Sequence, residues 1–186
     1  MKVLLLCHKM PYPPLDGGAQ LINNCIKGLI DNNVDVKVFA LNTPRIPVDV
    51  NSIPTEFKEK IKLIVADIDT GIHAYNAFIN LFRDQSYLIE RFYSKTVEDK
   101  LKLILQKQSF DIIQLEHLYM CLYLPALQKL SNAKIMLRPQ NVEYIVWEQY
   151  CKGLTNPFKK LYIELNTKRL KKYENNIIVI FCYLFN

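Results

Sequence analysis

The chain has 186 residues, of which half are hydrophobic and 23% are charged. This composition is that of a globular protein and excludes disordered and fibrous classes. Five glycines, nine prolines and the lack of any apolar run of about 18 residues also exclude collagen-like, linker-like and membrane-spanning chains. The net charge of +6 favours an anionic partner but is too small for a nucleic-acid-binding arm.

Short apolar runs alternate with longer segments of helical periodicity, which is typical of a parallel sheet covered by helices on both faces. The predicted strands are Lys2–Cys7, Val34–Leu41, Ile61–Ala66, Phe110–Leu115 and Lys134–Leu137. The predicted helices are Ala19–Ile30, His73–Phe82, Ser94–Gln106, Tyr119–Leu130 and Asn141–Tyr150, followed by a long helix that begins at Pro157. The sequence therefore predicts an α/β fold with a Rossmann-like parallel sheet.

The cysteines indicate a reducing compartment. They number five, are widely separated and form no C-x-x-C pair, so we predict free thiols in a cytoplasmic protein. The apolar run from Val3 to Cys7 is five residues long, shorter than the roughly 7–15 residues of a signal peptide's hydrophobic region. We interpret this run as a strand.

The long last helix carries much of the positive charge. Residues 157–174 hold six Lys and Arg side chains against two Glu, a net charge of +4. A solvated helix face is one explanation, and contact with an anionic membrane surface or an acidic partner is the other. The nine apolar residues from Ile177 to Phe185 are too few to span a membrane, and they either pair as a strand or stay exposed.

The connection between the first strand and the first helix is a shaped loop. Three prolines and two glycines fall within residues 11–18. Ligands of open α/β sheets bind beyond the carboxyl ends of the strands, and glycines at a helix N-terminus let backbone amides approach an anion. One interpretation is a phosphate site at Gly17 and Gly18, and the other is a rigid turn in which Asp16 caps the helix. The loop matches neither the dinucleotide-binding motif nor the P-loop motif.

Two further groups of polar residues follow strands at the same edge of the predicted sheet. Gln140, Asn141 and Glu143 come after the fifth strand, and Glu116 and His117 come directly after the fourth. Amide and carboxylate groups there can hydrogen-bond the hydroxyls of a sugar. Alternatively, Asn141 is the N-cap of the next helix, and Glu143 lies near the positive end of that helix dipole.

Other chemistry has little support in the sequence. His8 lies at the mouth of the first loop, where it either faces a ligand or is a structural residue. The spacings of His, Cys and carboxylate residues match no metal site, so we expect no metal. No Gly-x-Ser-x-Gly motif and no cysteine with a base partner supports a hydrolase.

The ordered set of motifs resembles the N-terminal domain of family 4 glycosyltransferases, the retaining bacterial enzymes of GT-B fold. The resemblance covers residues 1–175. It rests on the opening strand, the loop of residues 13–18, the stretch 137–144 with Trp147 and Glu148, and the helix that ends near Glu174. Where the family motif has a His, this chain has Gln140, which cannot carry a proton at neutral pH.

The resemblance implies that residues 1–175 form an acceptor-side domain, which pairs with a C-terminal domain that binds most of a nucleotide-sugar donor. It implies that Gly17 and Gly18 lie near the donor diphosphate. The residues implied on the acceptor side are Gln140, Asn141, Glu143, Glu116 and His117. No cofactor is implied, because basic side chains stabilise the leaving diphosphate without a metal.

Because the chain stops at Asn186, we expect a truncation before the C-terminal domain, with residues 176–186 as the start or remnant of the junction. The leading hypothesis is a hexosyltransferase-like domain of glycan biosynthesis that is inactive alone. Its partners are a nucleotide-sugar and a glycan or lipid-linked acceptor, with no nucleic acid. We expect it in the cytoplasm, with residues 157–174 contacting the inner face of the membrane. The alternative is a non-enzymatic flavodoxin-like module for a phosphate-bearing ligand or an anionic surface.

Overall fold

The computed structural model describes residues 1–184, which form two compact units. The first unit comprises residues 1–70 and 92–140, and the second comprises residues 71–91 and the chain from Asn141 onward. Each is described by itself.

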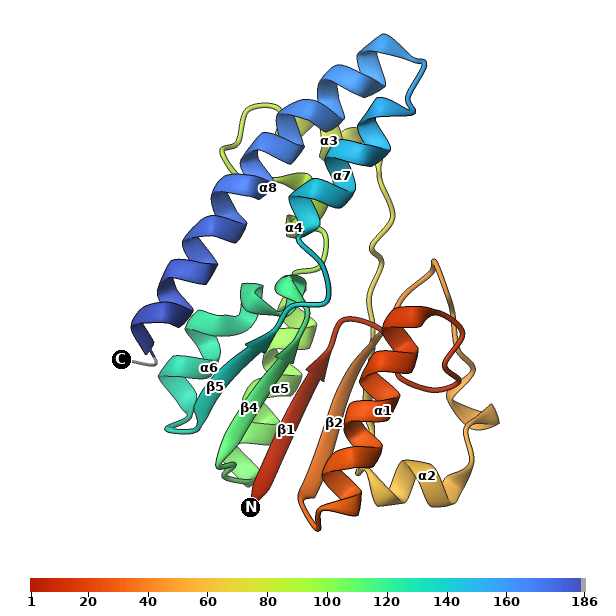
Figure 1. The fold of residues 1–186 in the computed structure, drawn as a ribbon, viewed down its shortest axis with the longest axis vertical. Helices are drawn as coiled ribbons and strands as arrows, with labels where there is room; N and C mark the ends of the chain where they lie inside the picture. The colour runs from red at the N-terminus through yellow and green to blue at the C-terminus, as the bar shows by residue number, and fades with distance from the viewer. Residues whose placement is uncertain (185–186) are drawn as a thin grey trace. The chain divides into compact units, whose positions relative to one another are not determined.

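The first unit is built on a five-stranded sheet. Its strands are β1 (Lys2–Cys7), β2 (Asp35–Asn42), β3 (Ile64–Asp67), β4 (Ile112–Glu116) and β5 (Lys134–Arg138). All neighbouring strands pair in parallel, in the order β3-β2-β1-β4-β5 (Figure 1). This order is that of the Rossmann fold, with a topological switch point between β1 and β4. The predicted fold class is confirmed.

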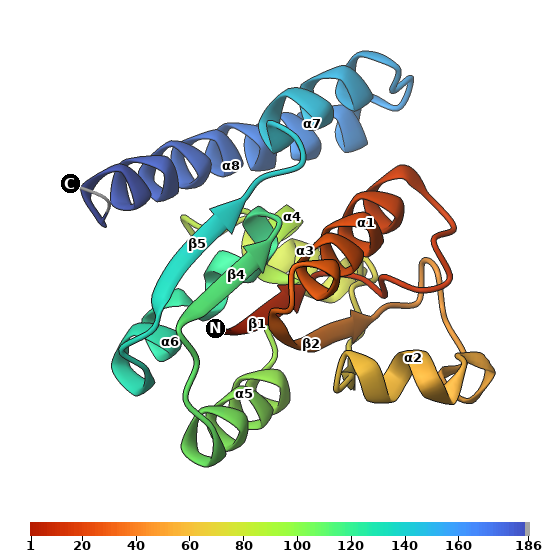
Figure 2. The ribbon, with the colours of Figure 1, turned by 60° about the horizontal axis from the view of Figure 1, so that its bottom comes forward.

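Helices cover both faces of this sheet. Figure 2 shows α1 (Gly17–Asp31) on one side and α5 (Lys95–Lys107) and α6 (Leu124–Leu130) on the other. On the α1 side, Ile22 and Ile26 of the helix pack with Leu5 of β1 and Val38 of β2, all four inaccessible to solvent. Residues 3–7 are buried on both faces, which is why the first strand is a continuous apolar run rather than an alternating one.

The structure adds short elements that periodicity did not predict. These are the 3₁₀ turn η1 (Val50–Ser52), the one-and-a-half-turn helix α2 (Thr55–Lys60) and the single turn α4 (Tyr87–Glu90). The predicted helix Tyr119–Leu130 is in fact the 3₁₀ segment η2 (Leu118–Tyr123) followed by α6. Pro125 lies in the first turn of α6, the only part of an α-helix where a proline ring fits without breaking the helix.

The second unit is helical. It contains α3 (Ala74–Asn80), α4, α7 (Glu143–Lys152) and the long α8 (Pro157–Leu184), with α7 and α8 side by side in both views (Figures 1 and 2). Asn166, inaccessible on α8, accepts a 2.7 Å hydrogen bond from the Tyr87 backbone N–H, which fixes α4. The apolar stretch from Ile177 continues α8 as a helix to Leu184 and does not pair as a strand, while Phe185 lies outside the described residues.

Candidate functional site

The loop between β1 and α1 closes on an ion pair. Asp16 has extended backbone angles, and its carboxylate accepts a 2.8 Å hydrogen bond from the Ala19 N–H, so Asp16 caps α1 as predicted. The Lys9 ammonium donates to both oxygens of that carboxylate, at 3.0 and 2.9 Å. Partial burial raises the pKa of Asp16, but the Ala19 amide and Lys9 outweigh it and hold that pKa below its usual value.

The two glycines that follow Asp16 have unequal surroundings. A Cβ on Gly18 would lie 2.7 Å from Lys9 Nζ and 2.8 Å from Gln140 Oε1, whereas a Cβ on Gly17 would meet nothing within 4 Å. Only a glycine therefore fits at position 18 without moving these side chains. The fold thus brings Gly18, from the predicted diphosphate loop, into contact with Gln140, from the predicted acceptor side.

Gln140 also carries an unusual amide group. Its Nε2 is buried and has no hydrogen-bond partner among residues 1–184. Buried polar nitrogens are normally satisfied, because an unmade hydrogen bond costs about 1–3 kcal/mol. Gln140 therefore has spare hydrogen-bonding capacity beside Lys9 and Gly18.

Glu116 lies at the carboxyl end of β4, as predicted, but its carboxylate is engaged within the first unit. It is inaccessible to solvent and accepts hydrogen bonds from Arg138 Nε at 2.9 and 3.0 Å and from Arg138 Nη2 at 2.7 Å. Arg138 Nη2 also donates to the Leu21 carbonyl of α1 at 3.2 Å. This bidentate pair joins β4, β5 and α1, so the Glu116 carboxylate serves a structural pairing.

His117 follows Glu116 and lies in a stack of buried rings. Its ring centroid is 4.1 Å from that of His8 and 4.3 Å from that of Tyr119, and both histidines are less than a tenth exposed. His117 has φ of 101° and ψ of 150°, a region that is almost exclusive to glycine and costs about 1–3 kcal/mol. Strained backbone of this kind clusters at functional sites, and here it lies at the predicted ligand edge.

Asn141 and Glu143 belong to the second unit, and the predicted N-cap there is wrong. Asn141 does not cap α7: the N-cap position is Val142, and the first N–H groups of the helix, those of Glu143 and Tyr144, donate to the carboxylate of Glu174 at 3.0 and 3.1 Å. The carboxylate of a distant helix thus replaces the local cap. Glu143 does lie in the first turn of α7, as expected, and accepts a 3.4 Å hydrogen bond from the Asn141 amide.

The sequence-predicted residues thus fall into three groups. Gly17, Gly18 and Gln140 surround the α1 N-terminus, Glu116 and His117 lie at the end of β4, and Asn141 and Glu143 stand on the second unit. Lys9 also belongs to the first of these groups, although no sequence motif singled it out. Its signal was present, because an amine directly after a strand end and a carboxylate at the N-cap seven residues later can pair across a short loop.

The residue at the end of the second strand argues against a dinucleotide site in the first unit. Rossmann enzymes place a ribose-binding carboxylate near the end of the second strand, where this chain has Asn42. The Asn42 amide accepts from the Val48 N–H at 3.0 Å and donates to the Val48 carbonyl at 3.1 Å and to Asp67 at 2.9 Å. It is fully engaged in holding the following loop.

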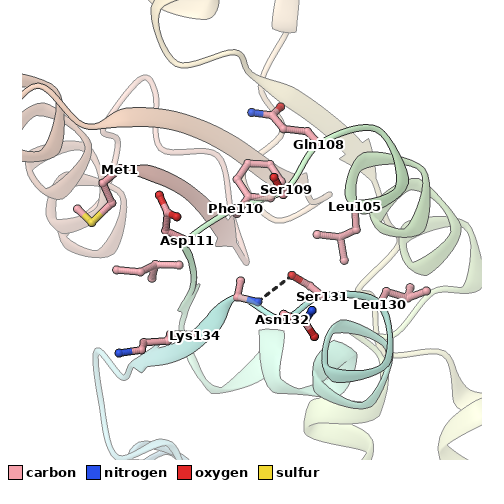
Figure 3. A pocket seen from close by; sticks show the side chains of 12 residues that line it. Met1, Leu105, Gln108, Ser109, Phe110, Asp111, Leu130, Ser131, Asn132 and Lys134 are labelled. Carbon is pink, nitrogen blue, oxygen red and sulfur yellow. Dashed lines mark hydrogen bonds between the residues drawn. The ribbon is translucent and has the colours of Figure 1, made fainter.

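One cavity of about 650 Å³ opens at the amino ends of β1, β4 and β5, the edge opposite the predicted site (Figure 3). Gln108, Asp111, Ser131 and Lys134 are among its lining residues, and none of the predicted site residues lines it. Within residues 1–184 no three His, Cys, Asp or Glu residues are grouped so that they could hold a metal ion. Over the same range, no helix is long and apolar enough to cross a membrane.

Comparison of the chain with protein-family models, with curated proteins and with solved structures finds no match. Functional inference therefore rests on the fold and the site.

Proposed function

We propose that the chain is the acceptor-side, Rossmann-like domain of a GT-B glycosyltransferase of family 4 type. Such a domain helps to move a sugar from a nucleotide-sugar to a glycan or lipid-linked acceptor when a second domain holds most of the donor. The observation that carries the proposal is the crowding at Gly18, where a helix N-terminus, the Lys9 ammonium and the Gln140 amide converge. All three lie at the sheet edge where α/β folds bind ligands.

This edge of the sheet would assist the reaction by electrostatic stabilisation of the leaving diphosphate. Departure of a nucleoside diphosphate from the sugar develops negative charge, which backbone N–H groups at a helix N-terminus and a nearby cation stabilise without a metal. In this proposal the Lys9 ammonium shifts from Asp16 toward the incoming phosphate, while the open space above Gly17 admits it. Gln140 and His117 then serve the acceptor side within the first unit, where Arg138 and Glu116 hold the end of β5 in place. Asn141 and Glu143, on the second unit, keep the acceptor-side roles that the resemblance implies.

The experiment is isothermal titration of the wild-type chain and of Lys9→Met with UDP-glucose, GDP-mannose and the free diphosphates UDP and GDP. Loss of a charge-assisted hydrogen bond should weaken diphosphate binding about tenfold or more. Lys27→Met is the matched control, because Lys27 is an exposed lysine of α1 and its substitution removes the same charge. Equal affinities for the two variants would contradict a phosphate role for Lys9.

A non-enzymatic binding module is the second candidate. It is favoured by the fact that Lys9, Gly17, Gly18 and Gln140 all belong to the first unit, so a phosphate-bearing ligand could be held without another domain. The same titration separates the two candidates. Tight binding by the chain alone, with no sugar turnover after addition of a donor-binding domain, supports the module.

A further inference from the structure

We propose that His8 is a sugar-positioning residue, whose imidazole Nε2 accepts a hydrogen bond from a hydroxyl of the donor sugar. The inference deepens the proposed function and rests on it. It names the group on the substrate that the loop after β1 recognises.

The contact of His8 with the end of β4 fixes the tautomer of its ring. His8 Nδ1 lies 2.9 Å from the backbone carbonyl oxygen of Glu116, in a buried setting. A carbonyl oxygen only accepts hydrogen bonds, so Nδ1 must carry the proton of that bond. In a neutral imidazole the other nitrogen, Nε2, is then an acceptor with a free lone pair.

The surroundings of the His8 ring favour its neutral form. Burial is the main cause that lowers the pKa of His8 well below its usual range, and His117 and Lys9 lower it further. The groups facing the ring are the Glu116 carbonyl, the His117 and Tyr119 rings and the Lys9 ammonium. The ring is therefore neutral at physiological pH, and Nε2 keeps its lone pair.

The Nε2 atom of His8 is available to a ligand. No residue within 1–184 hydrogen-bonds it. It is also not among the fully buried unpartnered atoms of these residues, which are Asn23 Oδ1, Gln140 Nε2 and Tyr162 Oη. Nε2 thus reaches solvent although His8 as a whole is only 7% exposed. A rigidly held acceptor with this limited opening is suited to a hydroxyl donor.

The proposed diphosphate site determines where the donor sugar would lie. His8 directly precedes Lys9, whose ammonium lies over Gly18 at the proposed diphosphate site. The sugar is bonded to that diphosphate, so its hydroxyls lie within a few bond lengths of the phosphate. The His8 ring itself lies against the Glu116 carbonyl and the His117 ring, at the end of the neighbouring strand β4. In this proposal the sugar extends from the diphosphate toward that strand end, where Nε2 accepts from its hydroxyl.

The test uses the whole 186-residue chain labelled with ¹⁵N, in which His8, His73 and His117 are the only histidines. Side-chain ¹⁵N spectra should show the Nδ1-protonated tautomer for His8. UDP-glucose or GDP-mannose should shift the Nε2 resonance upfield, whereas UDP and GDP should leave it in place. A proton on Nε2 in the free protein would overturn the inference.

The amide signals of Gly17 and Gly18 separate the two possible failures. If a nucleotide-sugar shifts these amides and His8 Nε2 does not move, this inference fails and the proposed function survives. If no nucleotide-sugar or diphosphate shifts the amide signals, the proposed function fails. The inference about His8 then fails as well, because it rests on that function.

The matched variant is His8→Asn, because its side-chain amide can still donate to the Glu116 carbonyl but has no atom in place of Nε2. Its affinity for the nucleotide-sugar should fall about fivefold, the effect of one neutral hydrogen bond, with diphosphate affinity unchanged. His73→Asn changes an exposed histidine of the second unit and should have no effect. If His8→Asn does not fold, the tautomer and titration of the wild-type chain still decide.

Discussion

At the scale of single residues, the two adjacent glycines of the first loop should differ in their tolerance of alanine. Alanine is favoured over glycine in a helix by up to about 1 kcal/mol. Gly17→Ala should gain part of this, because its Cβ enters open space, whereas Gly18→Ala must push aside Lys9 and Gln140. We expect Gly18→Ala to be less stable than Gly17→Ala in urea unfolding by up to about 1 kcal/mol, because the Lys9 and Gln140 side chains must move their ends away from the new Cβ. Equal stabilities would contradict the close packing at Gly18.

His8 should make the stability depend on pH. Its folded-state pKa lies below the unfolded value of about 6.5, so the unfolded chain binds more protons as the pH falls through that value. Stability is therefore complete above about pH 7 and declines on acidification. His8→Asn should show a smaller loss of unfolding free energy between about pH 7.5 and pH 5, because it removes this buried base. An identical loss in both proteins would show that His8 titrates normally.

At the scale of elements, the Glu116–Arg138 pair holds β4, β5 and α1 together. Arg138→Met should destabilise the chain by about 3–5 kcal/mol, because it leaves the buried Glu116 carboxylate without its cation and with only the Gln114 amide as a donor. The double variant Glu116→Gln, Arg138→Met should recover much of that loss, since no charge then remains buried. The measurement is urea unfolding of the three proteins, and additive losses would contradict the pair.

Periodicity predicted the strands and long helices well but not the elements between them. The exception is the third strand, which begins at Ile64 and not at Ile61, because Ile61 ends α2 and Lys62 turns with a positive φ. The first strand matches because its side chains are apolar on both faces and the run has only six residues, the length of a strand rather than of a buried helix. The short helices α2 and α4 have too few residues for a 3.6-residue repeat to be visible. The helical tail of α8 was ambiguous, because a short apolar run is compatible with either a strand or a helix.

The candidate site was predictable where its contacts are local in sequence. Asp16 capping Ala19 follows from a three-residue spacing, and the ends of the strands follow from the strand pattern. The cap that Glu174 supplies to Glu143 spans 31 residues, and the contact of Gln140 with Gly18 joins the segment after β5 to the first turn of α1. No local pattern encodes such partners, so the sequence located the edge of the site but not its pairings.

At the scale of the whole molecule, α8 offers an exposed basic surface that includes Lys168, Lys171 and Lys172. If a lipid-linked acceptor is used, the chain should float with liposomes that contain anionic lipid and not with neutral ones. Lys168→Glu with Lys172→Glu should weaken this partitioning about tenfold or more, because each basic residue near an anionic surface contributes about 1 kcal/mol. Lys27→Glu with Lys129→Glu, exposed lysines of the first unit, is the charge-matched control. Equal partitioning on both lipid compositions would contradict membrane contact.

Under the proposed function, this chain is the acceptor-side half of a sugar transferase. The most direct measurement is sugar release from UDP-glucose and GDP-mannose by the chain fused to a donor-binding domain of GT-B fold, compared with the same fusion carrying Lys9→Met. We predict release by the fusion, at least tenfold less with Lys9→Met, and none by the chain alone. Tight nucleotide-sugar binding by the chain alone, with no release by the fusion, would contradict the claim and favour a binding module.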